Sequence, residues 1–265
     1  MEDNLPVYRA LNEIGIENRA AALCTIIRAQ GSVPRREGAK MLVYADGSTV
    51  GTVGGGELEA RAIAAAIQVI RRRKTEILTV RLVDPDKGDA GVCGGEADLF
   101  IEPIQPQPTV LVLGCGHVGR EVASLAKWLG YRVSVSDDRE EYCTPEMVPD
   151  ADIYLPGKLP DALDSVEIDD SFYLVFVTRG VDPDIDGLPT LLKSDAAYIG
   201  VIGSRRRWLM TVKELKERGV SAKAIAKAKS PIGLDIGGET PREIALSIMA
   251  EITAQRNLTR VESCN

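Results

Sequence analysis

A glycine-rich turn between a predicted strand and a predicted helix restricts the fold of this chain more than any other feature. The apolar segment TVLVLG leads into the sequence GCGHVG at residues 114–119, which matches the pattern GxGxxG. A helix is predicted over residues 117–129, and a second apolar strand then ends at Asp137, about twenty residues beyond the turn. This succession is typical of a Rossmann-like unit that holds a nucleotide-type phosphate.

Each glycine of this turn has a physical reason. The first permits a tight turn, the second lets a phosphate approach the backbone, and the third lets the helix pack on the strand. The start of the helix offers unpaired N–H groups and the positive end of its dipole to an anion. Asp137 is expected to accept a hydrogen bond from a ribose hydroxyl and to disfavour a 2′-phosphate. The alternative is a loop that packs tightly and binds nothing.

The remainder of the C-terminal part alternates apolar strands with helices, which predicts a parallel sheet covered on both faces. The predicted strands are residues 131–137, 152–156, 172–178 and 197–203. The last helix begins with a capping box, in which Thr240 caps, Pro241 fits the first turn and Glu243 reaches back. The tail NLTRVESCN is expected to fray.

The N-terminal part predicts a smaller, mixed α/β domain. Its predicted helices are residues 5–16 and the alanine-rich stretch after Gly54–Gly56, and its predicted strands are residues 21–29, 41–44, 76–83 and 97–104. Asp46-Gly47 predicts a hairpin turn. Three prolines in IEPIQPQPTV indicate a stiff linker. We therefore expect an α/β protein with one domain over residues 1–106 and a Rossmann-like domain over residues 107–265.

Composition excludes several function classes. The 265 residues carry a net charge of −7, which argues against broad nucleic-acid binding. No apolar run is long enough to span a bilayer, and the N-terminus lacks the features of a signal peptide, so a cytoplasmic protein is expected. The five cysteines form no CxxC pair. His117 is the only histidine, which excludes a histidine cluster; it is expected to contact a phosphate or to serve a structural role.

Further glycine-containing loops suggest additional binding groups. Gly54–Gly56 form a second strand–glycine–helix junction, read either as an anion or pterin-type site or as a tight turn. Ser32, Pro34 and Arg35 lie in a polar loop where arginine can grip a phosphate or carboxylate. Cys93, beside Gly94 and Gly95, is either an accessible soft metal ligand or a small buried apolar residue.

Two loops of the C-terminal part complete this set. Arg205 and Arg206 follow a predicted parallel strand and open a helix, which is where ligands of open α/β sheets bind. The long loop SPIGLDIGGETPRE contains Asp235 and precedes the final helix. A loop this elaborate in a compact domain is more often functional than not.

Together these motifs resemble the XdhC/CoxI family, the xanthine dehydrogenase accessory proteins. The matching segments are GSVPRREGAKM, GTVGGGELE, VCGGEADLFIEP, LVLGCGHVGREVA, YIGVIGSRRR and SPIGLDIGGETPREIA, in that order. They extend over nearly the whole chain, and as a set they are far more specific than the glycine turn alone.

The resemblance implies a chaperone for the molybdenum cofactor, in its molybdopterin or nucleotide form, rather than an enzyme. It implies support for exchange of an oxo for a sulfido ligand and delivery to a xanthine dehydrogenase-type molybdenum hydroxylase. It also implies a homodimer, with the apo-enzyme and a cysteine desulfurase as partners. Cys93 is the candidate metal ligand. The candidate cofactor-binding residues are Ser32, Arg35, Gly54, Gly55, Gly56, Cys93, Gly94, Gly95, Gly114, Gly116, His117, Val118, Gly119, Asp137, Arg205 and Asp235.

One segment departs from the family pattern. After the strand FYLVFVT, relatives often show Thr-His-Asp-His, whereas this chain has Thr178-Arg179-Gly180 followed by valine. Altered chemistry, another cofactor form or a regulatory role would each account for the loss of both histidines. Two alternatives to the chaperone stay open: an NAD(P)-dependent oxidoreductase using the glycine turn and Asp137, and a nucleotide-sensing regulator.

Overall fold

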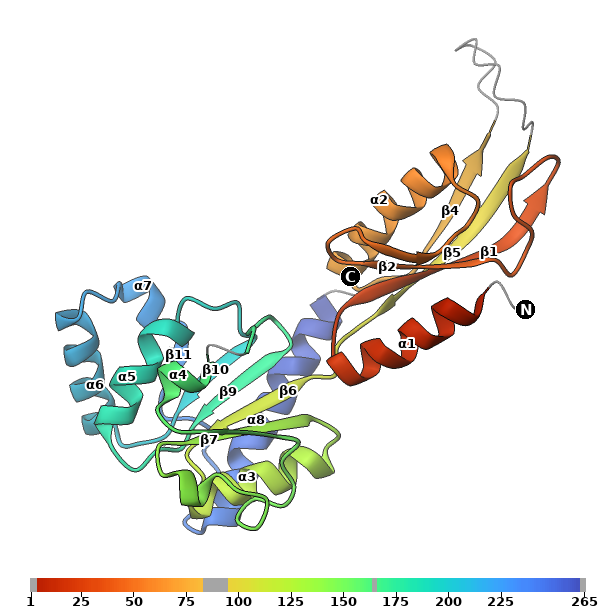
Figure 1. Ribbon diagram of the computed structural model, residues 1–265. Helices are drawn as coiled ribbons and strands as arrows, with labels where there is room; N and C mark the ends of the chain where they lie inside the picture. Colours follow the sequence, from red (N-terminus) through yellow and green to blue (C-terminus); the bar gives the residue numbers. More distant parts are fainter. Residues whose placement is uncertain (1–3, 83–94, 164–165, 263–265) are drawn as a thin grey trace. The chain divides into compact units, whose positions relative to one another are not determined.

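The computed structural model describes residues 4–82, 95–163 and 166–262, which divide into two compact units. One unit comprises Met1–Pro106 with Glu262–Asn265, and the other comprises Gln107–Val261 (Figure 1). Each unit has hydrophobic clusters of its own. The two units are therefore described separately.

The N-terminal unit is an antiparallel sheet with a helix on each face. The strand order is β3-β2-β1-β5-β4. Its elements are α1 (Leu5–Glu17), β1 (Ala21–Gln30), β2 (Lys40–Tyr44), β3 (Thr49–Gly51), α2 (Gly56–Arg72), β4 (Glu76–Arg81) and β5 (Glu96–Ile104). Leu58, Ala62 and Ala66 of α2 pack on one face, whereas Val7 and Ile14 of α1 pack against the other. The strands and hairpin predicted from the sequence are confirmed, except that β4 ends at Arg81 and residue 83 of the predicted strand 76–83 lies outside the described residues.

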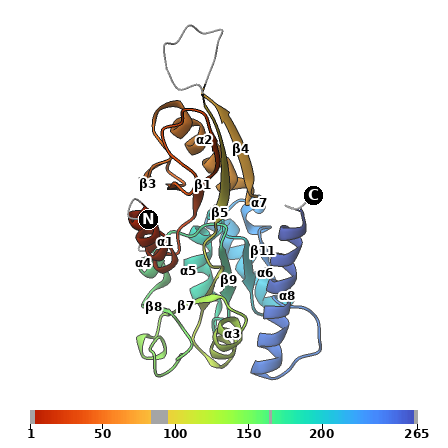
Figure 2. The same ribbon diagram turned by 90° about the vertical axis from the view of Figure 1, so that its right-hand side faces the viewer.

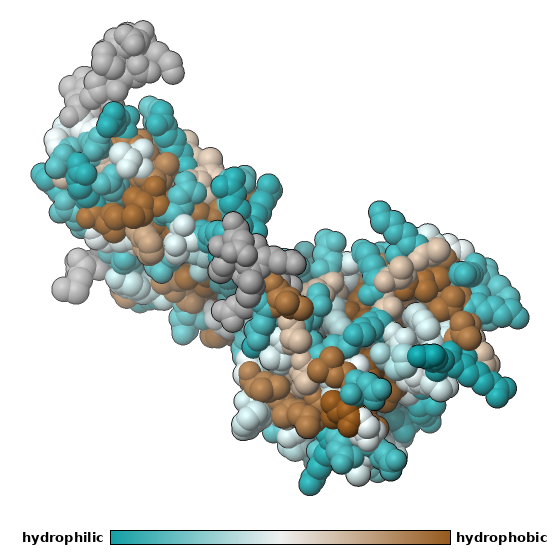
Figure 3. Space-filling view, turned by 180° about the vertical axis from the view of Figure 1, so that it is seen from behind, coloured by the Kyte–Doolittle hydropathy of each residue, from teal (hydrophilic) through white to brown (hydrophobic). Residues whose placement is uncertain are grey.

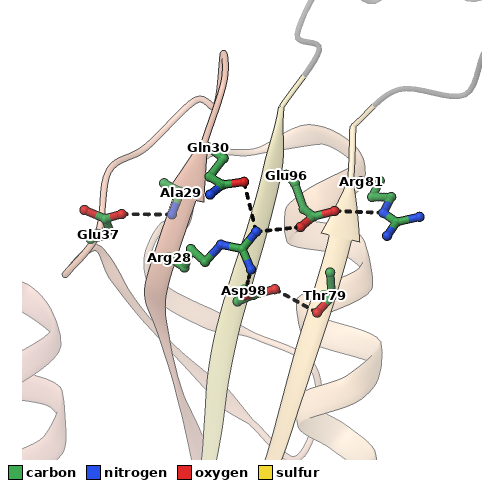
Figure 4. A network of polar contacts seen from close by, with 8 residues as sticks. All are labelled: Arg28, Ala29, Gln30, Glu37, Thr79, Arg81, Glu96 and Asp98. Carbon is green, nitrogen blue, oxygen red and sulfur yellow. Dashed lines mark hydrogen bonds and ion pairs between the residues drawn. The ribbon is translucent and has the colours of Figure 1, made fainter.

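The outer ends of β1, β4 and β5 carry a ladder of charged side chains on the face away from α2 (Figure 4). Arg28 donates hydrogen bonds to Glu96 at 3.0 Å and to Asp98 at 3.3 Å. Arg81 donates to the other oxygen of Glu96 at 2.7 Å, and Thr79 donates to Asp98 at 2.7 Å. Because these groups neutralise one another, this solvent-facing part of the sheet is polar without a net charge.

The C-terminal unit is a parallel sheet, as predicted, and its strand order is β11-β10-β9-β6-β7-β8. Its strands are β6 (Thr109–Leu113), β7 (Arg132–Asp137), β8 (Ile153–Pro156), β9 (Phe172–Phe176), β10 (Tyr198–Val201) and β11 (Ala228–Lys229). Its helices are α3 (His117–Trp128), α4 (Leu159–Leu163), α5 (Val181–Leu191), α6 (Arg205–Glu217), α7 (Ala222–Ile225) and α8 (Pro241–Glu262), with a short 3₁₀ helix, η2 (Glu140–Tyr142).

Two hydrophobic clusters lie on opposite faces of this sheet. One contains buried residues of α3 and α8, such as Val122 and Ile248, and the other contains residues of α5 and α6, such as Leu188 and Leu215. Helix α8 runs along one side of the unit (Figure 2). It is tied to the sheet by buried Glu251, which accepts hydrogen bonds from Tyr198 and Lys229.

The final helix begins as predicted but ends later. The Thr240 N–H donates to Glu243 at 2.9 Å, and the Glu243 N–H donates to the Thr240 hydroxyl at 3.3 Å, which confirms the capping box. The predicted fraying is wrong for residues 257–262, since α8 continues to Glu262. Those residues contain neither glycine nor proline, so nothing in the local sequence stops the helix.

Candidate functional site

A cavity of about 1010 Å³ lies at the carboxyl ends of the parallel strands in the C-terminal unit. Residues that follow β6, β7, β8, β9 and β10 line it, including Gly116, Asp138, Lys158, Arg179 and Gly203. Strand β6 lies between β7 and β9, so the chain leaves β6 toward one side and later returns on the other. Ligands of open α/β sheets bind at this kind of topological switch point.

The glycine turn after β6 combines two crowded glycines with one that borders open space. Gly114 has φ of +111°, and a Cβ atom there would lie 2.8 Å from the carbonyl oxygen of Val177. A Cβ at Gly119 would lie 1.8 Å from the carbonyl oxygen of Gly114, so the third glycine allows α3 to pack on the turn. A Cβ at Gly116 would meet no protein atom within 4 Å. The middle glycine therefore borders open space.

Helix α3 begins at His117, directly beside this open space. Its N-cap, Gly116, supplies no side-chain hydrogen bond, so no protein side chain caps the first turn from that position. Both His117 and Val118 line the cavity, and the His117 side chain is exposed. The start of α3 thus offers backbone N–H groups and a dipole to an anion in the cavity.

Asp137 lies at the predicted place, but its carboxylate is already occupied. One oxygen accepts hydrogen bonds from the backbone N–H and Nε of Arg139, at 3.0 and 2.9 Å. The other accepts from the Cys115 N–H at 2.7 Å and from Nη2 of Arg139 at 2.9 Å. The Asp137 side chain is 2% exposed. Its oxygens therefore face the protein's own donors.

The charge of Asp137 is stabilised by these donors. Burial alone would raise the pKa of the Asp137 carboxyl, but the hydrogen bonds from Arg139 and the Cys115 N–H outweigh this effect and hold that pKa below its ordinary value. The same interaction raises the pKa of Arg139. Both groups stay ionised near neutral pH as a paired unit beside the glycine turn.

Basic and aromatic side chains surround this pair. The guanidinium carbon of Arg139 lies 3.8 Å from the ring centre of Tyr142, and that of Arg120 lies 5.8 Å from the same ring. Nε of Arg120 donates to the carbonyl oxygen of Cys115 at 3.1 Å. Together with Lys158, which follows β8, these residues line one end of the cavity. We call Arg120, Arg139, Tyr142 and Lys158 the cationic corner.

Arg207 anchors the loop that follows β9 at the other end of the cavity. Its Nη2 donates to the Thr178 hydroxyl, the Gly180 carbonyl oxygen and the Asp184 carboxylate at 2.8, 2.6 and 2.6 Å. Burial raises the pKa of Asp184, although hydrogen bonds from Thr178 and Arg207 act in the opposite direction. This network fixes the segment in which the two family histidines are absent.

Several candidate residues of the N-terminal unit also come together. A Cβ at Gly54 would lie 2.7 Å from the Pro34 ring, and a Cβ at Gly95 would lie 2.3 Å from the Ser32 carbonyl oxygen. Glu59 accepts hydrogen bonds from the Gly55 N–H at 3.1 Å and from the Thr52 hydroxyl at 2.5 Å. The polar loop, the triple glycine and the start of β5 are thus in contact.

The sequence-predicted residues fall into three groups. The first group lies at the glycine turn and consists of Gly114, Gly116, His117, Val118, Gly119 and Asp137. The second group belongs to the N-terminal unit and consists of Ser32, Arg35, Gly54, Gly55, Gly56 and Gly95. The third group, Arg205 and Asp235, is exposed and does not line the cavity. Cys93 and Gly94 lie outside the described residues. Within the described ranges, no group of three or more His, Cys, Asp or Glu side chains is arranged to hold a metal ion.

Sequence reasoning missed Arg207 and the cationic corner. Arg207 belongs to the same arginine run as Arg205 and Arg206, and the direction of α6 decides which of the three enters the cavity. Arg139 stands two residues after Asp137, a spacing that could have indicated a local ion pair. No motif in the sequence marks Lys158 as a binding residue. Only the pairing of β7 with β8 brings it to the cavity edge of the sheet.

The described helices, over residues 4–82, 95–163 and 166–262, include none with the length and apolar character needed to cross a membrane. Large apolar side chains are nevertheless exposed on α6 and α8, among them Leu209, Met210, Leu246 and Leu258. From behind, hydrophobic and hydrophilic residues alternate in patches over the surface (Figure 3). The predicted homodimer stays a prediction.

Comparison with known proteins identifies relatives of differing length. A protein of Escherichia coli strain K12 described as the uncharacterized protein YqeB is 34% identical over 243 residues, which are 91% of this chain and 44% of YqeB. A Bacillus subtilis strain 168 protein, described as a probable xanthine dehydrogenase subunit, is 32% identical over 165 residues, which are 62% of this chain and 48% of that protein. The chain thus spans less than half the length of both.

A third relative has a length similar to that of this chain. The molybdenum cofactor insertion chaperone PaoD of Escherichia coli strain K12 is 22% identical, over 99% of this chain and 92% of PaoD. A crystal structure from Bacillus halodurans, described as a xanthine dehydrogenase, superposes with a TM-score of 0.51 at 22% identity, covering 94% of this chain and 95% of the other. At this identity the likeness concerns the fold alone.

The family comparison accounts for both units. Residues 110–252, which include the glycine turn and nearly all of the parallel sheet, match the XdhC Rossmann domain. Residues 17–81, which include most of the antiparallel sheet, match the XdhC and CoxI family. The family expected from the sequence motifs is confirmed, and the chain belongs to the XdhC and CoxI family.

Proposed function

We propose that this protein binds the molybdenum cofactor and delivers it to a molybdenum hydroxylase of the xanthine dehydrogenase type. The observation that carries the proposal is the cavity of about 1010 Å³ bordered by the glycine turn. Ligand sites range from about 300 to 1,000 Å³, so this cavity has room for a pterin cofactor together with a nucleotide extension. The relative PaoD is named for the insertion of this cofactor.

The residues present fit such a ligand. The open space at Gly116 and the backbone N–H groups at the start of α3 suit the phosphate of the cofactor. His117 and Val118 border the same space. When bound, the cofactor supplies a molybdenum centre whose terminal ligand can be exchanged; the chain holds the anionic part and shields the ligand from solvent.

The proposal extends to sulfuration of the cofactor before delivery, with a cysteine desulfurase and the apo-enzyme as partners of a homodimer. Support for these finer steps comes from the family resemblance. In the N-terminal unit, Ser32, Pro34, Gly54 and Gly95 lie together and form a separate candidate group for binding an anion. The protein acts in this scheme as a carrier rather than a catalyst.

The test compares two substitutions at Gly116. A Cβ there meets no protein atom, and its φ of −72° suits any residue, so both Gly116→Ala and Gly116→Val should fold. We expect valine to fill the phosphate position and abolish retention of the cofactor, whereas alanine reduces it less. The readouts are the fluorescence of oxidised pterin in protein purified from cofactor-producing cells, and reconstitution of an apo molybdenum enzyme. Undiminished retention by the valine variant would overturn the proposal.

A second candidate function is nucleotide sensing. The complete strand–glycine–helix unit at the switch point favours it, because that arrangement binds dinucleotides in many unrelated proteins. Titration with NADH and NADPH separates the two functions. Tight nucleotide binding without any retained pterin would favour the sensor, and nucleotide oxidation coupled to a substrate would favour an oxidoreductase.

A further inference from the structure

We propose that the cationic corner binds a phosphate carried on the ribose of a nucleotide, so that the cavity accepts NADP-type nucleotides in preference to NAD-type nucleotides. The inference names a second ligand class for the cavity and goes beyond delivery of the molybdenum cofactor. The inference depends on the proposed function in one respect: both ligands would bind in the same cavity. Four features support it: the state of Asp137, the strand register, the balance of charge and the chemistry of the side chains.

The state of Asp137 removes the usual reason for preferring NAD. In NAD sites an acidic residue at the end of the second strand accepts hydrogen bonds from the ribose hydroxyls, and its free charge repels a 2′-phosphate. Here both Asp137 oxygens accept bonds from Arg139 and the Cys115 N–H. With its charge paired and its side chain 2% exposed, Asp137 no longer opposes an anion in the way that the sequence predicted.

The strand register brings Lys158 to the same edge. Asp137 pairs with Pro156 across β7 and β8, and the Gly157 N–H donates to the Asp137 carbonyl oxygen at 3.0 Å. Lys158 therefore lies two residues past the partner of Asp137, as Arg139 lies two residues past Asp137 itself. Both cations extend the ends of adjacent strands, where a Rossmann-type site receives the ribose of the adenosine half.

The balance of charge at this end favours an anion. Asp137 is paired with Arg139, and Asp138 with Arg179 at 3.3 Å. Among the residues that the structure describes, neither Arg120 nor Lys158 has a carboxylate partner, which leaves two positive charges in excess.

Other acidic side chains do not cancel this excess. Glu140 and Glu141 are exposed on η2 and do not line the cavity. Asp182 and Asp186 do line it, but both follow β9, on the opposite side of β6 from β7 and β8, and Asp186 is paired with Arg218 at 3.1 Å. The excess positive charge therefore belongs to the corner itself.

The side chains suit a phosphate monoester. Arg139 is held in place by Asp137 and by the Tyr142 ring, and its Nη1 remains for a ligand. Arginine and lysine donate charge-assisted hydrogen bonds to phosphate oxygens, which are about twice as strong as neutral ones. A ribose hydroxyl in the same place would leave both excess cations without an anionic partner. The corner thus distinguishes ligands by one phosphate.

Calorimetric titration of the full chain with two small probes tests this inference. Adenosine 2′,5′-bisphosphate and adenosine 5′-monophosphate differ only in the ribose phosphate. We expect the bisphosphate to bind roughly tenfold more tightly or better at low salt, since a hydrogen bond to a charged group is worth that much. NADPH and NADH should show the same order of affinity.

Variants locate the effect. Lys158→Gln should bring the two affinities within about twofold, and Arg120→Gln should act in the same direction. Lys216→Gln on α6, also an exposed lysine but outside the cavity lining, is the matched control and should leave the preference intact. Equal affinities in the unchanged protein, or a preference that survives Lys158→Gln and Arg120→Gln together, would overturn the inference.

The outcomes separate this inference from the proposed function. Retention of the pterin cofactor by a protein that shows no phosphate preference would remove the inference alone. A preference for the bisphosphate in a protein that never retains pterin would remove the cofactor proposal alone. Gly116→Val should abolish both kinds of binding, because both ligands place a phosphate at the glycine turn.

Discussion

At the scale of single residues, Asp137 shows how a correctly located side chain can have an unexpected role. The sequence places a carboxylate at the end of β7, and the structure confirms that it borders the cavity. Its four hydrogen bonds, however, come from Arg139 and the glycine turn. Asp137 therefore joins β7 to the turn after β6, and its first effect is on the shape of that turn.

The pH dependence of stability should report this role. Because the pKa of Asp137 in the folded chain lies below its unfolded value of about 4, its interactions stabilise the fold above that value and are lost as pH falls through the folded pKa. Asp137→Asn should lower the free energy of unfolding at pH 7 by about 1.5–3 kcal/mol, the contribution of hydrogen bonds to a charged group. It should also flatten the loss of stability in acid. Urea unfolding at several pH values measures both; an unchanged acid profile would contradict the assignment.

The positions of the glycines could be predicted from the sequence, because each follows from backbone geometry in a known order of elements. The pairing of Asp137 with Arg139 could not, since it depends on which rotamers the two side chains adopt. The position of Lys158 at the cavity could not be predicted from the sequence for another reason. Its place beside Arg139 follows from strand pairing, which joins residues that are distant along the chain.

At the scale of elements, the junction between β6 and α3 depends on close backbone contact. Gly119→Ala would place a Cβ 1.8 Å from the Gly114 carbonyl oxygen, so the helix would have to shift away from the turn. We expect a loss of about 1–3 kcal/mol in unfolding free energy, the range for overpacked sites. The matched control is Gly116→Ala, whose Cβ meets nothing within 4 Å. Similar stability of the two alanine variants, by chemical denaturation, would argue against the contact.

The start of α8 depends on its capping box. Thr240→Ala removes the hydroxyl that accepts the Glu243 N–H, and the expected cost is about 1 kcal/mol of unfolding free energy. Thr240→Ser keeps an acceptor at the same position and should cost less. Thermal unfolding followed by circular dichroism compares the two, and equal melting temperatures would show that the cap contributes little.

Element prediction succeeded where periodicity and caps were strong and failed where they were not. The strands of both sheets except β11, and helices α1, α2, α3, α6 and α8, follow from apolar patterns and glycine or proline signals. Helix α5 was not predicted because Pro183 and Pro189 interrupt its sequence. Pro183 lies in the first turn, where its missing N–H is tolerated, whereas Pro189 lies inside the helix and cannot donate the hydrogen bond to the Ile185 carbonyl oxygen. Burial of the Ile185 and Leu188 side chains stabilises the helix despite both prolines.

At the scale of the whole molecule, the chain has two units with separate hydrophobic clusters. The glycine turn, the cationic corner and the Arg207 network all belong to the C-terminal unit. All the residues that line the cavity belong to the C-terminal unit, so the proposed nucleotide binding requires no residue of the N-terminal unit.

A fragment of residues 107–265 tests this independence. We expect it to fold alone and to bind adenosine 2′,5′-bisphosphate with an affinity within about threefold of that of the full chain, because domains with their own core fold as units. A fragment that is unfolded by circular dichroism, under conditions in which the full chain is folded, would contradict the prediction.

The order of strands in the parallel sheet has a consequence for how ligand choice can diversify. The glycine turn follows β6, whereas the cations that read the ligand follow β7 and β8, apart from Arg120 on α3. The loop that binds the common phosphate and the loops that distinguish one ligand from another are therefore mostly different loops at the same edge of the sheet. A descendant of this chain can exchange one or two side chains after β7 or β8 and accept a new molecule, while the inherited glycine turn keeps its shape.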